Sequence, residues 1–249
     1  MPHPLSFSKY KKLFFLILFV SFFSFSFGTP SNESLKRDSI LKSQKVKIDP
    51  KLRLGAQVGY GYRFANRPST GDPNMNKHLK KLKNNLSFGA DLSYYLKDYL
   101  GVGIKYNANV THVVTENVSY MFQDGTKVFY NQFSELIGTH YLGAYLLMQY
   151  FVIPQKQCIF VNVGAGYLRH TNDVGTYKLK YPSGKERIVH VAKNSAAFFA
   201  EIGYDFFITK HFAIGLQTSA LIELKKVLLT DPESISHIDV SLAFRFYNL

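Results

Sequence analysis

Apolar side chains recur at every second position in eight separate stretches of this chain, and this alternation constrains the fold more than any other feature. The clearest case is LSFGADLSYYLKDYLGVGIKYNANV, which begins at Leu86. The alternation stops at Lys97-Asp98 and resumes from Leu100 to Val110. A period of two indicates two β-strands joined by a tight turn.

The same pattern predicts six further strands. They begin at Leu52, Leu142, Ile159, Ala196, Phe212 and Ile238. Eight such stretches predict an all-β fold and leave no room for a helix of any size.

The N-terminus has the features of an export signal. Three lysines precede the apolar run Leu13–Val20, and small residues stand at Ser26 and Gly28. This order is typical of a cleaved signal peptide over residues 1–28, and a membrane anchor helix is the alternative. Residues 29–51 are polar and predict a flexible segment. Residues 52–249 are then long enough for one all-β domain.

The exported protein is basic. Its formal net charge falls from +13 to +10 when residues 1–28 are removed, because they carry three lysines and no acid. A basic exported protein suits anionic lipid or polysaccharide surfaces, and nucleic acid is not expected as a partner. Cys158 is the single cysteine, so neither an intramolecular disulfide nor a cysteine metal site is expected. No cofactor is predicted.

The links between the strands alternate in length. Three are short turns, and the others are long and polar: 66–83, 115–136, 169–193 and 223–237. Short turns at one end and long loops at the other are typical of a transmembrane β-barrel. The pattern therefore predicts an eight-stranded, antiparallel, up-and-down transmembrane β-barrel.

The second face of each strand indicates which face meets lipid. It is rich in Gly, with Ser, Asn and Gln between, whereas the alternating apolar face is bulky and nearly free of charge. A soluble lipocalin-like barrel is the alternative, and it would need a water-facing surface crowded with charged residues. Small residues suit a tightly curled concave face. We therefore expect the apolar face to point outward into lipid.

The chain resembles the small eight-stranded outer-membrane β-barrels of the OmpA-transmembrane-domain and OmpX type, often called porin-family proteins. The resemblance rests on this architecture and on the last stretch, HIDVSLAFRFYNL. Its apolar residues alternate as Val240, Leu242, Phe244 and Phe246, although the chain ends in Leu249 rather than an aromatic residue. The resemblance implies a bacterial outer-membrane location and insertion by the barrel-assembly machinery. It also implies a monomer with a structural or surface-interaction role, such as adhesion or ligand binding.

Charged and amide side chains on the inward face predict a polar network in the lumen. The residues near mid-height are Gln57, Asp91, Lys105, Glu201, Gln217 and Arg245. Asp91 and Lys105 are candidates to meet one another. Charges of both signs in a narrow lumen should pair, and eight strands leave an interior just wide enough for side chains. A packed polar core is therefore expected rather than a large-solute pore, with a gated ion path as the alternative.

Two features of the long loops bear on partners. Lys77, Lys80, Lys81 and Lys83 lie close together in the first loop and are candidates to contact lipopolysaccharide head groups. In the third loop, Pro182-Ser183-Gly184-Lys185 predicts a hairpin that carries two strands beyond the membrane. Such a protruding edge suits β-strand addition by an extracellular ligand or a host surface.

An enzyme that modifies lipid A is the alternative function. His112 and His140 are expected on the outer face near the external ends of adjacent strands, with Glu116 and Ser134 close in sequence. A Ser–His–acid set is recognised by geometry, which sequence does not provide. No metal site and no catalytic residue is predicted here, and we expect a non-enzymatic protein.

Overall fold

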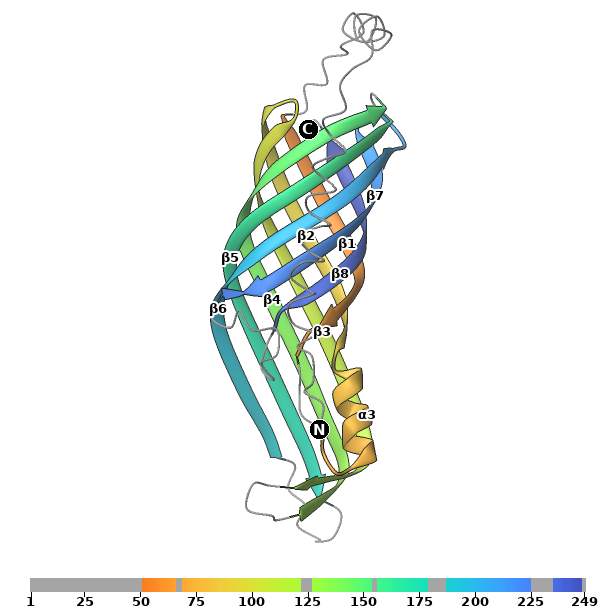
Figure 1. The fold of residues 1–249 in the computed structure, drawn as a ribbon, viewed down its shortest axis with the longest axis vertical. Helices are drawn as coiled ribbons and strands as arrows, with labels where there is room; N and C mark the ends of the chain where they lie inside the picture. Colours follow the sequence, from red (N-terminus) through yellow and green to blue (C-terminus); the bar gives the residue numbers. More distant parts are fainter. Residues whose placement is uncertain are drawn as a thin grey trace, which may run out of the picture. The chain divides into compact units, whose positions relative to one another are not determined.

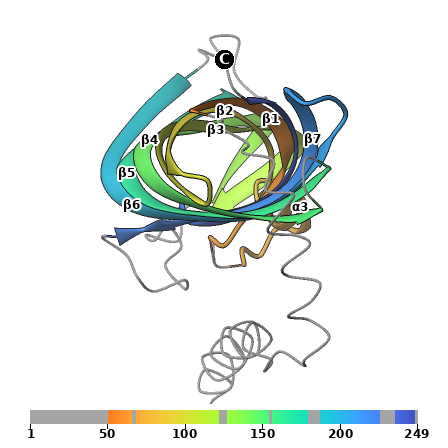
Figure 2. The same cartoon turned by 90° about the horizontal axis from the view of Figure 1, so that it is seen from above.

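A computed structural model describes residues 51–65, 69–121, 127–153, 156–178, 187–224 and 235–247. Their strands form one closed antiparallel barrel in the order β1 to β8, in which β8 pairs with β1 (Figures 1 and 2). The strands are β1 (Leu52–Arg63), β2 (Asn84–Lys97), β3 (Leu100–Met121), β4 (Lys127–Ile153), β5 (Gln157–Lys178), β6 (Arg187–Phe207), β7 (Phe212–Glu223) and β8 (His237–Tyr247). The predicted eight-stranded up-and-down topology is confirmed. The predicted signal peptide (1–28) and all but the last residue of the predicted flexible segment (29–51) lie outside the described residues.

Side chains alternate between the two faces of the barrel wall, as the period of two predicts. In β8 every second residue is buried and every other residue is exposed. The exposed positions carry the apolar column: Leu86 is 64% exposed and Ile104 is 56% exposed. The apolar face therefore points outward, which is the reverse of a soluble lipocalin-like barrel.

Glycine on the inward face makes room for large side chains. A Cβ added at Gly203 would overlap the ring of Phe160, which is fully buried inside the barrel. At Gly101 an added Cβ would lie 2.9 Å from the Tyr94 carbonyl oxygen of the next strand. The Gly-rich inward face thus reflects crowding within a narrow barrel.

Two of the four predicted long loops are largely strands. β3 and β4 stay paired up to Met121 and Lys127, and β5 and β6 stay paired up to Thr176 and Arg187. The prediction of a loop over 115–136 is therefore wrong. Over 169–193 the prediction of a long loop is wrong, whereas the expected continuation of the two flanking strands is confirmed, because β5 runs to Lys178 and β6 begins at Arg187. These segments read as loops because they are polar, but a strand above the membrane needs no lipid-facing apolar column. The predicted turn at 182–185 lies outside the described residues.

Strands β3 to β6 extend beyond the ends of the other four strands. The β6–β7 pairing ends at Ala197 and Glu223, whereas β5 and β6 continue for about ten residues, or roughly 30 Å. Figure 1 shows β3 to β6 continuing at the lower end of the barrel. We call this part the strand extension; it comprises residues 112–121, 127–139, 170–178 and 187–193.

A short helix, α3 (Pro73–Lys81), lies in the first long link, so the prediction of no helix is wrong. Asp72 caps it by accepting hydrogen bonds from the N–H groups of Asn74 and Met75, and Pro73 suits the first turn. Met75 and His78 form its buried side. No helix among the described residues is long and apolar enough to cross a membrane.

Helix α3 is anchored to the strand extension. Asp72 accepts hydrogen bonds from the backbone N–H and the hydroxyl of Ser119 on β3. Asn74 donates to the Asn117 carbonyl at 3.0 Å, and His78 Nδ1 lies 2.9 Å from Thr115 Oγ1. Partial burial acts to raise the pKa of Asp72, but the hydrogen bonds from Ser119 outweigh it and hold that pKa below its ordinary value.

Candidate functional site

Three buried ion pairs lie inside the barrel, each between side chains at most 3% exposed. They are Arg53–Asp91 at 3.0 Å, Lys105–Glu201 at 2.5 Å and Arg245–Asp205. The three positive and three negative groups balance in charge. The first pair joins the neighbouring strands β1 and β2, the second joins β3 to β6, and the third joins β8 to β6. The last two pairs therefore connect strands that are not neighbours in the barrel wall.

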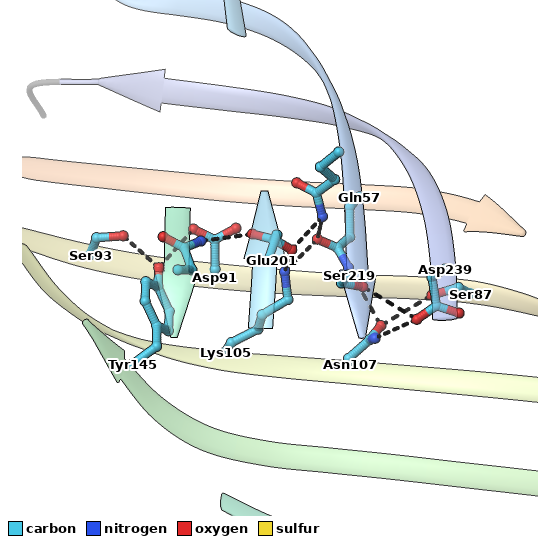
Figure 3. Close-up of polar contacts among 12 residues, drawn as sticks. Gln57, Ser87, Asp91, Ser93, Lys105, Asn107, Tyr145, Glu201, Ser219 and Asp239 are labelled. Atoms are coloured by element: carbon cyan, nitrogen blue, oxygen red, sulfur yellow. Dashed lines mark hydrogen bonds and ion pairs between the residues drawn. The ribbon is translucent and has the colours of Figure 1, made fainter. Parts of the chain in front are cut away.

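Lys105 and Glu201 lie at the centre of a hydrogen-bonded cluster (Figure 3). Lys105 Nζ also donates to Gln57 Oε1 at 2.7 Å. The Gln217 amide donates to Gln57 and, at 2.8 Å, to Glu201 Oε2, while Asn162 donates to Glu201 Oε1 at 2.7 Å. Both oxygens of the Glu201 carboxylate are therefore satisfied, which a buried charge requires.

Asp91 has different partners from those that the sequence suggested. Asp91 and Lys105 are opposite one another in the β2–β3 register, but Asp91 pairs with Arg53. The Tyr145 hydroxyl donates to Asp91 at 3.1 Å and lies 2.5 Å from Ser93 Oγ. Asp91 thus belongs to a second cluster beside the one built on Lys105 (Figure 3).

Arg245 joins the third ion pair to the central cluster. It donates to Asp205 and to the side-chain oxygen of Gln217. The Tyr247 hydroxyl donates to the other Asp205 oxygen at 2.6 Å. Through Gln217 this ion pair is continuous with the cluster around Lys105.

The ring of Phe160 contacts two arginines. The guanidinium carbons of Arg53 and Arg245 are 5.1 Å and 4.4 Å from its centroid. Among the described residues, Nε and Nη1 of Arg53 and Nε of Arg245 have no hydrogen-bond partner. Cation–π contact with Phe160 compensates part of the lost solvation of these groups.

Further polar contacts continue toward the end that carries the long links. The Asn107 amide donates to Asp239 at 3.4 Å, and Gln57 donates to Asn107 at 3.5 Å. His237 Nε2 lies 3.4 Å from Asp239 Oδ2 and 2.8 Å from Asn109 Nδ2. The polar groups thus follow one another along the lumen.

The structure brings five of the six predicted lumen residues into one connected network and places the sixth, Asp91, in the neighbouring cluster. The prediction omitted Tyr145, Phe160, Asn162 and Tyr247, which complete these clusters. Their sequence signal was available, because each stands at an inward position of its alternating strand.

Helix α3 carries three of the four predicted lipopolysaccharide-contacting lysines. Lys77, Lys80 and Lys81 are exposed, on the helix side opposite the buried Met75. Lys83 is half-buried, and its Nζ lies 6.0 Å from the centroid of the Tyr62 ring. The helix thus presents a compact positive surface made of Lys77, Lys80 and Lys81.

His112 and His140 lie on the outer face and have separate partners. His112 Nε2 is 3.3 Å from Ser134 Oγ, and His140 Nδ1 is 2.8 Å from the Tyr106 hydroxyl oxygen. Glu116 is opposite Gln132 in the β3–β4 register. Within the described part of the chain, no group of three His, Cys, Asp or Glu residues could hold a metal ion.

No protein-family model and no curated protein sequence matches the chain. Several solved structures are similar to it. Ail of Yersinia pestis, solved with the heparin analogue sucrose octasulfate, is 13% identical, with a TM-score of 0.41 over 79% of this chain and 98% of Ail. Neisserial surface protein A is 8% identical, with a TM-score of 0.42 over 80% and 97%. The N-terminal barrel domain of Pseudomonas aeruginosa OprF is 13% identical, with a TM-score of 0.36 over 80% and 98%.

The features of this chain itself define its fold class. Eight antiparallel strands close into a ring, and short turns join them at one end. The outer face is apolar, and the inner face holds the buried ion pairs. The chain therefore has the fold of the small eight-stranded outer-membrane β-barrels.

Proposed function

We propose that this protein is an integral outer-membrane barrel whose lumen is a packed polar core, and that it acts through the surface outside the membrane. The observation that carries the proposal is the set of three buried, charge-balanced ion pairs inside the barrel. A pore for solutes needs water between its charged groups, whereas these groups contact one another directly.

Large side chains support a closed lumen as well. Phe160, Phe199 and Tyr145 are at most 4% exposed and point inward together with the ion pairs. An eight-stranded barrel has an interior that side chains can fill completely. The ion pairs and rings then fix closure and register rather than a transport path.

Conductance in a planar bilayer tests the closed lumen. We expect the refolded protein, checked by heat-modifiable migration in a gel, to give no large and stable channels. Phe160→Ala removes a large buried ring from the lumen, and this variant should conduct more than the wild type if that packing closes the lumen. Large and stable channels from the folded wild-type protein would contradict a packed core.

The strand extension supports a role at the cell surface. It continues β3 to β6 past the end of the β6–β7 pairing, and helix α3 is anchored to it. Its outer face carries polar groups such as Ser134, Thr171 and the Asp173–His190 pair. A paired sheet outside the membrane offers a ligand or host surface a rigid binding platform.

The lysines of α3 suit the anionic sugar and phosphate groups of lipopolysaccharide. Lys77, Lys80 and Lys81 are exposed on one short helix that the Asp72 cap and the His78 contacts hold in place. Replacing these three lysines by Gln should lower retention of lipopolysaccharide by the folded barrel and reduce its salt dependence. If the variant retains as much lipopolysaccharide as the wild type, helix α3 does not make the proposed contact.

The last strand supports insertion by the barrel-assembly machinery. Val240, Leu242, Phe244 and Phe246 alternate on its outer face and are 38–51% exposed. We propose that this strand is the recognition signal and that the inserted protein is a monomer. In cells depleted of the machinery, we expect the heat-modifiable folded form of this protein to be absent. A normal amount of the folded form in those cells would contradict this route of insertion.

A further inference from the structure

We propose that the outer face of the barrel holds the phosphate of a lipid headgroup between Arg169 and His140. The proposal goes beyond the closed lumen and the surface role, and it rests only on the apolar face meeting lipid. It concerns the end of the apolar face that adjoins the strand extension.

Arg169 and His140 stand side by side at the border of the apolar face. They are direct partners in the β4–β5 register, and both side chains point outward. The next outward residues toward the membrane are Tyr167, 51% exposed, and Leu142, 57% exposed. On β4 the apolar positions then continue to Val152, which spans about 25 Å of bilayer at the usual strand tilt. The pair therefore lies at headgroup level.

Arg169 is a cation without a partner among the residues that the structure describes. Its side chain is exposed, and no hydrogen bond or ion pair joins it to any described residue. Asp173, the acid four residues farther along the same strand face, is already paired with His190. A charged group beside an apolar surface needs an anion, and a guanidinium binds phosphate with two parallel hydrogen bonds.

His140 is oriented to provide a second donor. The Tyr106 hydroxyl contacts its Nδ1 at 2.8 Å, and the two rings are stacked with centroids 6.2 Å apart. When the hydroxyl donates to Nδ1, the imidazole proton resides on Nε2. Nε2 then points away from Tyr106 with a hydrogen to donate.

Thr171 and His140 cover the backbone at Gly138, which is itself buried. A Cβ added there would lie 2.8 Å from Thr171 Oγ1 and 3.5 Å from His140 Nε2. The Thr171 hydroxyl donates to the Gly138 carbonyl, so the donors that face outward for phosphate oxygens are the guanidinium of Arg169 and Nε2 of His140.

Native mass spectrometry of the folded protein released from detergent tests the site. The probes are lipid A with both phosphates, the same lipid A after enzymatic removal of its phosphates, and phosphatidylglycerol. We expect Arg169→Gln to weaken retention of phosphorylated lipid A about tenfold, the effect of losing one charge-assisted interaction. The double variant Arg169→Gln/His140→Gln should retain still less.

Lys97→Gln is the matched control, because Lys97 is an exposed cation at the short-turn end of β2. It should behave as the wild type does. Heat-modifiable migration shows that each variant is folded.

The comparison of the lipids identifies the source of the phosphate. If the protein retains phosphorylated lipid A better than phosphatidylglycerol, the bound phosphate belongs to lipid A. If it retains both lipids equally, and Arg169→Gln weakens both equally, the site binds phospholipid as well. Equal losses in the Arg169 and Lys97 variants, or undiminished retention of dephosphorylated lipid A, would overturn the proposal while leaving the conductance result untouched.

Discussion

Lys105 and Glu201 form an ion pair across the lumen, with Nζ 2.5 Å from Oε2, although β3 and β6 are not neighbours in the sheet. The pair therefore joins parts of the barrel wall that no backbone ladder connects. It is fully desolvated, so its contribution depends on both partners being present.

Removal of one partner of this pair should be far more damaging than removal of both. Lys105→Met leaves the Glu201 carboxylate buried and uncompensated, and we expect a loss of about 3–5 kcal/mol in the free energy of unfolding. The double variant Lys105→Met/Glu201→Gln should recover most of that loss. Urea unfolding in phospholipid vesicles measures both. Equal destabilisation of the single and double variants would show that the pair does not act as a unit.

The crowding around the inward glycines predicts that substitutions at buried and exposed glycines differ in their effect on the free energy of unfolding. Gly203→Ala places a methyl group against the buried Phe160 ring, and we expect a cost of about 1–3 kcal/mol from overpacking. Gly71→Ala is the matched control, because nothing lies within 4 Å of a Cβ at that position. The same unfolding measurement should show little change for Gly71→Ala. Similar values for the two variants would contradict a tightly filled lumen.

Docking of α3 should depend on pH through Asp72. The pKa of Asp72 is lower in the folded protein than its ordinary value of 3.8, so its contribution is fully present above about pH 4. That contribution is lost as the pH falls below 4 toward the lowered pKa. Hydrogen exchange of residues 73–81 should therefore accelerate in acid. Asp72→Asn should exchange faster at neutral pH and show a smaller acid dependence; an unchanged acid dependence would contradict this role of Asp72.

The sequence predicts which face of the barrel wall each side chain occupies, but it does not predict which side chains contact one another. Alternation places Leu86 outside and Asp91 inside, because a period of two leaves each residue only two directions. It does not select partners: Asp91 faces Lys105 in the register yet pairs with Arg53, since side-chain length and strand stagger decide which inward groups meet.

Helix α3 escaped prediction for a related reason. Its inward residues Met75, His78, Leu79 and Leu82 do follow a helical spacing, but they cover only about two turns of a lysine-rich link. The contacts that anchor the helix come from Ser119 and Thr115 of a distant strand. The part of the strand extension in β3 and β4 was missed because its residues carry no continuous apolar column, whereas the turn residues 182–185 did predict that β5 and β6 run on. Contacts made in three dimensions, rather than local patterns, determine α3 and the extension of β3 and β4.

A non-catalytic role predicts unaltered lipid A. Mass spectra of lipid A from cells lacking this protein should match those from wild-type cells, because His112 and His140 have separate partners, Ser134 and Tyr106. A mass change restored by the wild-type gene but not by His140→Ala would support a lipid A-modifying enzyme instead.

The central claim, that the apolar face meets lipid, is tested most directly at two adjacent residues of β6. Phe198 is 53% exposed and points outward, whereas Phe199 is 1% exposed and points into the lumen. The natural sequence contains no Trp, so Phe198→Trp and Phe199→Trp each introduce a single fluorophore. In vesicles that contain brominated phospholipid, we expect strong quenching of the Trp at position 198 and little quenching at position 199. Strong quenching at 199, or quenching at 198 by aqueous iodide but not by brominated lipid, would contradict the account.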